Sequence, residues 1–160
     1  MDDNAAIYKF STHAEFEAHL DDCIGRADST LHMFDPDFAV FPLGSTDMDA
    51  ALRQFLAGGG SIQMAMHRSS HIERHYPRFL RLLSDYSHKV ECKITSKSLH
   101  HLTDSFCIAD GVHIVRRFHS DHMRGEAAFD SPASTEISAE RFAGIWLETI
   151  SVLHATTTGL

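Results

Sequence analysis

Histidine offers the most candidates for catalysis or metal binding in this chain, since 13 of its 160 residues are histidines. His67, His71 and His75 recur at every fourth position. On an α-helix each such step turns the side chain by about 40°, so the three imidazole rings could share one face and bind a borderline metal ion such as Zn²⁺. No H-E-x-x-H pattern is present, and Pro77 interrupts a continuous helix here. The three histidines are candidate metal ligands, with a solvated or hydrogen-bonded structural role as the alternative.

Several common catalytic and cofactor motifs are absent from the sequence. The glycine run at residues 58–61 (GGGS) lacks the Gly-Lys-Ser/Thr ending of a phosphate-binding loop. Neither a G-x-S-x-G elbow nor a G-x-G-x-x-G dinucleotide fingerprint occurs. The three cysteines include no C-x-x-C pair, which argues against a disulfide framework and a thiolate zinc site. We therefore expect no cofactor.

Charge is distributed unevenly along the chain, whose formal net charge is −8. Residues 1–57 hold 11 acidic against 3 basic side chains, whereas residues 58–160 hold 11 of each. Within the second part, residues 67–124 carry 10 basic and 6 acidic side chains together with 9 of the histidines. This local excess of positive charge predicts a surface that binds anions. Scattered, solvated charges are the alternative.

The elements that must position these residues are predicted from apolar periodicity and end signals. A T-x-x-E capping box at Thr12 opens the first helix, and a proline marks the start of the third. The predicted helices are residues 12–27, the segment from the Ser45/Thr46 cap to the glycine run at 58–60, and the segment that starts at Pro77. The predicted strands are residues 31–34, 62–66, 90–94, 106–109 and 112–118, with an irregular apolar loop at 38–43.

The carboxyl-terminal third contains the clearest local signal, the Asp110-Gly111 pair, which predicts a tight two-residue hairpin. Residues 119–136 are small and polar and predict a loop. The last helix is predicted to begin at a Ser138 cap, with Ile137 and Phe142 forming a hydrophobic staple, and the tail at 156–160 to be weakly structured or docked. The order α-β-α-β-α-β-β-β-α predicts one α/β domain over residues 1–160, a mixed sheet flanked by helices.

Residues 99–150 resemble the carboxyl-terminal part of a phospholipase D superfamily half-domain. The shared features are an apolar strand that ends in aspartate, a hairpin, a second strand, a polar loop and a closing helix with Phe142-x-x-x-Trp146. The resemblance implies a phospholipase D-like fold over most of the chain. The chain is also similar to bacterial proteins that share the Asp-Gly hairpin, an Arg-Arg-Phe-His segment and a Thr-Thr-x-Gly-Leu ending.

The superfamily's H-x-K-x4-D motif is degenerate here. When Asp110 is set against the motif's aspartate, Thr103 stands at the position of the histidine and Ser105 at that of the lysine. Residues 115–118 (VRRF) stand where a Gly-Ser-x-Asn segment would lie. In the superfamily, two histidines, one from each half-domain, serve as nucleophile and general acid through a phosphohistidine. Threonine and serine do neither without a neighbouring base, so the resemblance implies a fold that has lost its catalysis.

Three residues, His100, His101 and Asp110, keep a catalytic role open. His101 lies two residues before Thr103, so a shifted register could bring it, or its neighbour His100, into the site. Asp110 remains a catalytic candidate, although the hairpin alone also explains it as a turn residue. The alternative function is therefore a phosphodiesterase or nuclease that uses His100 or His101. A histidine-based metal binder is a further alternative.

The predicted function is a non-catalytic phospholipase D-like binding or interaction module, with a basic, His/Arg-rich surface formed by residues 67–81 and 100–124. Arg116 and Arg117 could replace the motif's lysine as anion clamp, and only one of them should face the site because neighbouring strand residues point to opposite faces. The expected ligand contains phosphate. The predicted anion-binding residues are Arg116, Arg117, His100, His101 and Arg78.

The compartment and the partners are predicted from the apolar runs, the first residues and the family resemblance. The chain has no run of 18 or more uncharged apolar residues and begins with an acidic segment, which predicts a cytoplasmic protein with no membrane partner. Superfamily members with one half-domain pair about a two-fold axis, so the resemblance implies a homodimer. The sequence names no protein partner.

Overall fold

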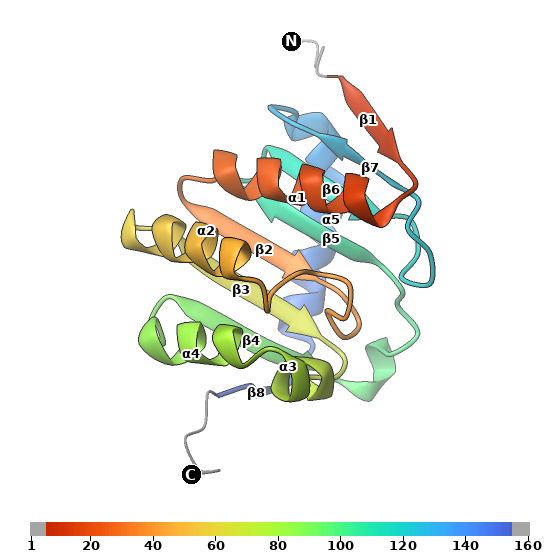
Figure 1. Cartoon of the computed structure of the whole chain (residues 1–160). Helices are drawn as coiled ribbons and strands as arrows, with labels where there is room; N and C mark the ends of the chain where they lie inside the picture. The colour runs from red at the N-terminus through yellow and green to blue at the C-terminus, as the bar shows by residue number, and fades with distance from the viewer. Residues whose placement is uncertain (1–5, 155–160) are drawn as a thin grey trace.

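Eight strands form one mixed sheet in the order β1-β7-β6-β5-β2-β3-β4-β8 (Figure 1). The central strand β5 is buried at every position, whereas the edge strands β1 and β8 are mostly exposed. The computed structural model describes residues 6–154. β2, β3 and β4 are parallel neighbours, and the other pairs are antiparallel. The strands are β1 (Ile7–Phe10), β2 (Thr30–Phe34), β3 (Ser61–Met66), β4 (Val90–Thr95), β5 (Ser105–Ala109), β6 (His113–Arg117), β7 (Gly125–Ala128) and β8 (Thr149–Val152).

Helices cover both faces of the sheet. In Figure 1, α1 to α4 lie in front of the strands and α5 lies behind them. The helices are α1 (His13–Arg26), α2 (Thr46–Ala57), α3 (Ser70–His75), α4 (Pro77–Asp85) and α5 (Pro132–Leu147), with a 3-10 turn, η1 (Lys97–Leu99). This arrangement confirms the prediction of a mixed sheet flanked by helices. No helix within residues 6–154 is long and apolar enough to cross a membrane.

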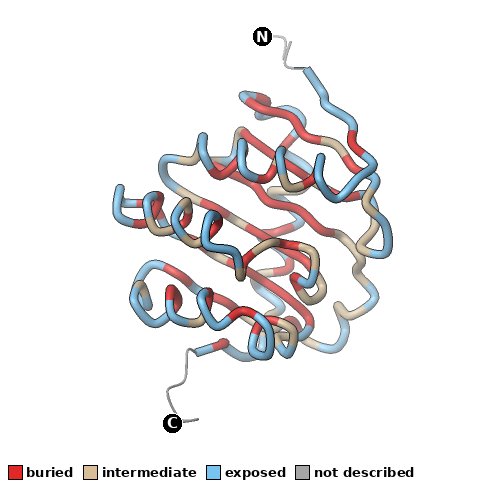
Figure 2. Tube along the Cα trace, in the orientation of Figure 1, coloured by how far each residue is buried: buried red, intermediate tan, exposed pale blue. Residues whose placement is uncertain are grey.

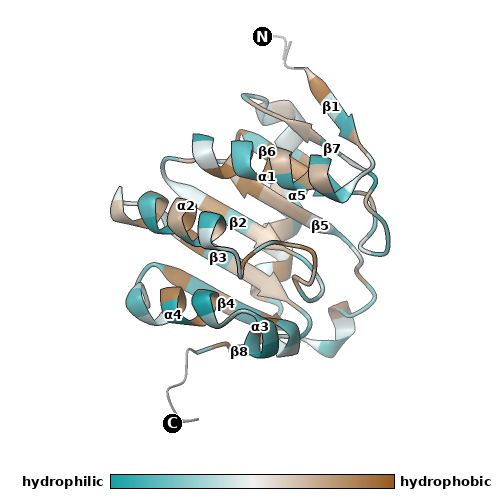
Figure 3. Cartoon of the chain, in the orientation of Figure 1, coloured by the Kyte–Doolittle hydropathy of each residue, from teal (hydrophilic) through white to brown (hydrophobic). Residues whose placement is uncertain are grey.

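The sheet separates two hydrophobic cores. The larger packs α1, α2 and α4 against one face through side chains such as Leu20, Leu52 and Leu82. The smaller lies under α5 and includes Phe34, Phe106 and Phe142. Figure 2 shows the buried residues running along the central strands, and Figure 3 shows apolar colour on the same strands with polar colour on the outer helix surfaces. Burial of these side chains supplies the main driving force for the fold.

Local end signals place several elements where the sequence predicts them. Thr12 caps α1 with both halves of the capping box, and Ser45 caps α2 by accepting a hydrogen bond from the Met48 amide. Pro77 is the first residue of α4. Asp110 and Gly111 both have positive φ, at 56° and 71°, and lie in the hairpin that joins β5 to β6. Because Ala109 pairs with His113, the loop spans residues 110–112 and is one residue longer than the predicted two-residue turn.

The end of the chain differs from the sequence prediction. The predicted loop at 119–136 contains β7 and the first turn of α5, because the cap of α5 is Ser131, followed by Pro132 at the first helical position. The predicted Ser138 cap and the Ile137–Phe142 staple are therefore wrong, since Ile137 lies inside the helix with 78% of its surface exposed. The edge strands β1 and β8 were not predicted. The predicted tail at 156–160 lies outside the described residues.

Candidate functional site

A cavity of about 350 Å³ opens beyond the carboxyl ends of the parallel strands β2 and β3. Asp35 directly follows β2, and His67 directly follows β3. Arg117, the last residue of β6, and the segments around Leu102 and Ser120 complete the wall. Ligands of α/β sheets commonly bind beyond the carboxyl ends of parallel strands. This cavity is therefore the candidate functional site.

A buried ion pair lies at the base of the cavity. Nη2 of Arg117 donates to Oδ1 of Asp35 over 2.8 Å, and the two side chains are only 2% and 1% exposed. Nε of Arg117 donates to Oγ of Ser105 over 3.3 Å, and Nη1 donates to the carbonyl oxygens of Ser120 at 3.0 Å and His122 at 3.3 Å. Each nitrogen of the guanidinium group thus has an acceptor within the protein.

Asp35 is held from a second side by its own loop. Its Oδ2 accepts hydrogen bonds from the amides of Asp37 at 3.0 Å and Phe38 at 2.6 Å. Burial raises the pKa of Asp35, while hydrogen bonds from Ser105 and Asp37 and the charge of Arg117 act against that rise. This set of partners fixes the carboxyl group in place beneath the cavity.

His67 is fully engaged within the protein. Its Nε2 lies 2.9 Å from the Leu102 carbonyl oxygen, which can only accept, so Nε2 carries the proton. In the neutral ring, Nδ1 then accepts a hydrogen bond from the Thr95 hydroxyl at 2.6 Å. Burial lowers the pKa of His67 and favours this neutral form. With both nitrogens occupied, His67 holds the loop at Leu102 against the sheet and has no lone pair free for chemistry.

His100 and Arg68 also line the cavity, and they remain available to a ligand. The His100 ring is half-buried with its centroid 4.8 Å from that of His67. Within residues 6–154, neither the His100 ring nor the Arg68 guanidinium group has a hydrogen-bond partner. Thr103 lines the same wall. Asp37 and Asp121 add negative charge at the rim.

The other catalytic candidates lie elsewhere. His101 is exposed and does not line the cavity, although it neighbours His100. Asp110 lies at the opposite end of β5 from Ser105, where its carboxylate accepts hydrogen bonds from the amides of residues 28–30 at 2.7 to 3.0 Å. Burial raises the pKa of Asp110, but these three backbone donors outweigh burial and bring the pKa below its ordinary value. Asp110 therefore ties the hairpin to β2.

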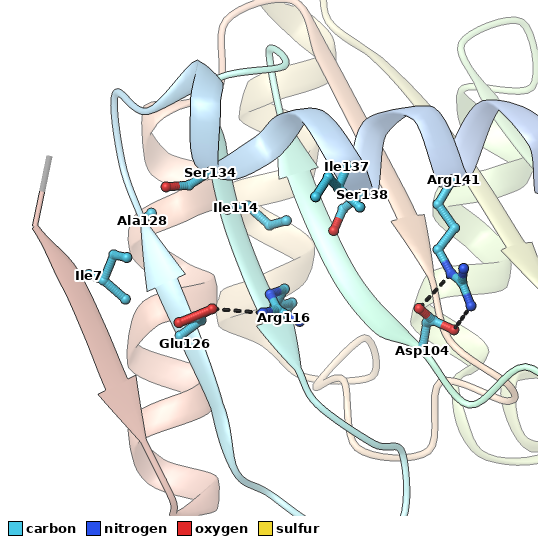
Figure 4. A pocket seen from close by; sticks show the side chains of 10 residues that line it. All are labelled: Ile7, Asp104, Ile114, Arg116, Glu126, Ala128, Ser134, Ile137, Ser138 and Arg141. Atoms are coloured by element: carbon cyan, nitrogen blue, oxygen red, sulfur yellow. Dashed lines mark hydrogen bonds and ion pairs between the residues drawn. The ribbon is translucent and has the colours of Figure 1, made fainter. Parts of the chain in front are cut away.

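Arg116 and Arg117 point to opposite faces of the sheet. Nη2 of Arg116 donates to Oε1 of Glu126 over 2.7 Å on the α5 side, away from the cavity. Figure 4 shows this pair beside a second one, in which Arg141 of α5 binds Asp104. Arg78 is also outside the cavity and donates to the Gly44 carbonyl oxygen over 2.8 Å. Of the three arginines predicted to bind anions, Arg78, Arg116 and Arg117, only Arg117 lines the candidate site.

The predicted helical face of histidines does not form. His67 precedes the short helix α3, which begins at Ser70, whereas His71 and His75 lie on that helix with ring centroids 4.6 Å apart. Since His67 uses both nitrogens elsewhere, the expectation that the three histidines share one helix face is wrong. Among residues 6–154, no group of three or more His, Cys, Asp or Glu side chains could hold a metal ion.

Sequence reasoning missed Asp35, Arg68 and the His67–Thr95 contact as parts of the site. The signal that could have found Asp35 is its place directly after an apolar strand that has a parallel neighbour. Arg68 is the second residue after the next strand, β3. The pairing of Asp35 with Arg117 spans 82 residues and has no local signal.

Comparison with known proteins shows which family the chain belongs to. The family described as a domain of unknown function (DUF7931) matches residues 12–154. The chain belongs to this family. No curated protein matches it.

Solved structures share the fold at low sequence identity. Nuc from Salmonella typhimurium, a phospholipase D family member, aligns with a TM-score of 0.65 and 14% identity over 94% of this chain and 98% of its own. TrmBL2, an archaeal chromatin protein, aligns with a TM-score of 0.67 and 8% identity over 93% of this chain and 55% of its own. NucT from Helicobacter pylori aligns with a TM-score of 0.59 and 12% identity over 92% of this chain and 99% of its own. The fold of this DUF7931 member is phospholipase D-like.

Proposed function

We propose that this chain is a non-catalytic phospholipase D-like module that binds a phosphate-containing ligand at the cavity beyond β2 and β3. The observation that carries the proposal is the buried Arg117–Asp35 pair, whose arginine also donates to Ser105. Ser105 stands at the lysine position of the superfamily motif, as the resemblance places it. A structural ion pair therefore occupies the region where that motif would require a phosphate-binding lysine.

The groups around the cavity support a role without catalysis. Transfer of a phosphoryl group through a phosphohistidine needs one imidazole with a free nitrogen and a second group that gives a proton to the leaving oxygen. Thr103, at the motif's histidine position, has no imidazole. His67 has both nitrogens engaged in hydrogen bonds. Among the residues that line the cavity, His100 is then the one imidazole left, and no second imidazole can serve as general acid beside it.

His100 and Arg68 are the groups that support anion binding. Both line the cavity and have free donors, and Thr103 adds a hydroxyl group to the same wall. Asp37 and Asp121 oppose an anion at neutral pH. Phosphate should bind less tightly as salt rises, because added ions screen its attraction to the Arg68 guanidinium group. TrmBL2, which shares the fold, is a chromatin protein that binds DNA, so a nucleic-acid phosphate is one source of the ligand.

Titration with inorganic phosphate and with a short single-stranded oligonucleotide, followed by amide chemical shifts, tests the proposal. Loss of a charge-assisted hydrogen bond in Arg68→Ala or His100→Ala should weaken binding by about tenfold. Arg78→Ala is the matched control, since Arg78 is a cation outside the cavity. Equal effects from Arg78→Ala and Arg68→Ala, or affinity that does not depend on salt, would contradict the proposal.

A further inference from the structure

A second recess lies on the other face of the sheet, between α5 and the strands β2, β3 and β5. This groove has a volume of about 560 Å³, which is within the range of small-molecule sites. It lies near Thr30, the first residue of β2, whereas the Arg117 cavity lies beyond the last residue of that strand. Its α5 wall is formed by Ala139, Phe142, Ala143, Trp146 and Leu147.

The sheet side of the groove carries polar groups that leave hydrogen-bonding capacity unused among residues 6–154. Thr30 and His32 lie on the same face of β2, and Gln63 of β3 stands directly beside His32 in the register. Within residues 6–154, the Thr30 hydroxyl and both His32 nitrogens make no hydrogen bond. The Gln63 amide nitrogen makes one long contact of 3.4 Å with Glu91, and its carbonyl oxygen makes none. Several donors and acceptors are therefore available in a mainly apolar recess.

Stacked rings form the apolar part of the groove. The His32 ring lies parallel to Phe142, with 4.8 Å between centroids and 13° between planes. Phe142 in turn stacks on Trp146 at 5.6 Å and 27°. Lys93 lies over the Trp146 ring at 4.5 Å. Ala139 and Ala143 are small, which keeps the space beside these rings open.

The lining restricts the chemistry of the ligand. An acyl chain would displace water from Thr30, His32 and Gln63 without offering hydrogen bonds in return, and such burial is costly. A phosphate or carboxylate group would meet Asp110 at the rim, which repels anions. Burial lowers the pKa of His32, so its ring is neutral and offers one donor and one acceptor. A ring system with donors and acceptors on its edge matches all of these groups.

We propose that this groove binds a neutral, planar heteroaromatic ring of the nucleobase type, with His32 and Gln63 bonding to its polar edge. Such a ring combines apolar faces, suited to the stacked wall, with alternating donors and acceptors along one side. The base can be presented as a free nucleoside or by a single strand. This site is independent of the phosphate-binding proposal, because it lies on the other face and uses none of the same residues.

Trp146 provides the assay, because it is the chain's one tryptophan and it lines the groove. We would titrate the intact protein with adenosine, guanosine, cytidine and uridine while recording tryptophan emission, and detect binding in parallel by saturation-transfer NMR of the nucleosides. At least one nucleoside should give a saturable change. His32→Phe keeps a ring against Phe142 but removes the two ring nitrogens that would bond to the base, and should weaken that binding by about tenfold.

A matched pair of alanine variants locates the site. Ala143→Leu fills the groove and should abolish binding, whereas Ala133→Leu, the same change at an exposed position of α5 outside the groove, should leave it intact. If a single strand binds where nucleosides do not, loss of that binding in Ala143→Leu supports the strand as the source of the base. Absence of saturable binding by both methods, or binding unaffected by Ala143→Leu and His32→Phe, would overturn the proposal. A saturable response to a fatty acid alone would overturn it as well.

Discussion

Replacement of Arg117 by methionine tests whether the buried pair holds the site together. Methionine keeps much of the volume but removes the bond to Asp35 and the donors to Ser105, Ser120 and His122. Asp35 is 1% exposed and would be left buried without its cation. Breaking a buried ion pair from one side costs about 3–5 kcal/mol. Asp35 keeps two backbone donors, so we expect the free energy of unfolding to fall by about 3–4 kcal/mol.

Urea unfolding followed by far-UV circular dichroism measures this loss. Arg116→Met is the control, because Arg116 is the neighbouring residue on β6 and its pair with Glu126 is 39% and 23% exposed. An exposed pair contributes about 0–1 kcal/mol, so the two variants should differ clearly. The double variant Asp35→Asn/Arg117→Met removes the unpaired charge and should lose less than the sum of the two single losses. A free energy of unfolding for Arg117→Met within about 1 kcal/mol of that for Arg116→Met would refute the reasoning.

Four further results are expected. Asp110→Ala should lose about 2–4 kcal/mol of unfolding free energy, because three backbone amides lose their acceptor and alanine tolerates the φ of 56° poorly, whereas Asp110→Asn should lose less. The pKa of Asp110 in the folded protein is below its ordinary value of 3.8, so the charged carboxylate stabilises the fold above pH 3.8. The difference in melting temperature between the wild type and Asp110→Asn should therefore shrink as the solution is acidified below that pH. Gly125→Ala should lose about 1–3 kcal/mol in the urea assay, since the added Cβ would collide with the Arg116 carbonyl oxygen and the Phe10 ring. We also propose that the chain pairs with a second copy, in which case light scattering should return twice the chain mass of 17.9 kDa, and a monomer mass at tens of micromolar would contradict this.

The parts of the fold that could be predicted have signals within a few residues. The capping box at Thr12, the Asp110-Gly111 turn and Pro77 each restrict the backbone locally, and the structure has elements where these signals place them. Ser138 misled because a serine before an apolar run also resembles a cap, while the Ser131-Pro132 pair seven residues earlier carries the real one.

The parts that could not be predicted depend on contacts between distant residues. β1 and β8 are four-residue edge strands whose formation depends on pairing with β7 and β4. The site combines Asp35 with Arg117 across 82 residues, and only the three-dimensional structure brings them together. The sequence did place Arg116 and Arg117 on opposite faces, because side-chain alternation is a local property of a strand.

Turnover of an activated phosphodiester tests the central claim most directly. The account predicts that purified protein hydrolyses bis(4-nitrophenyl) phosphate no faster than the buffer does, between acidic and neutral pH, and that His100→Ala and His101→Ala leave this background unchanged. Thr103 and Ser105 supply neither imidazole nor amine at the motif positions, and His67 has no free nitrogen. Hydrolysis clearly above the background that disappears in His100→Ala or His101→Ala would contradict the account.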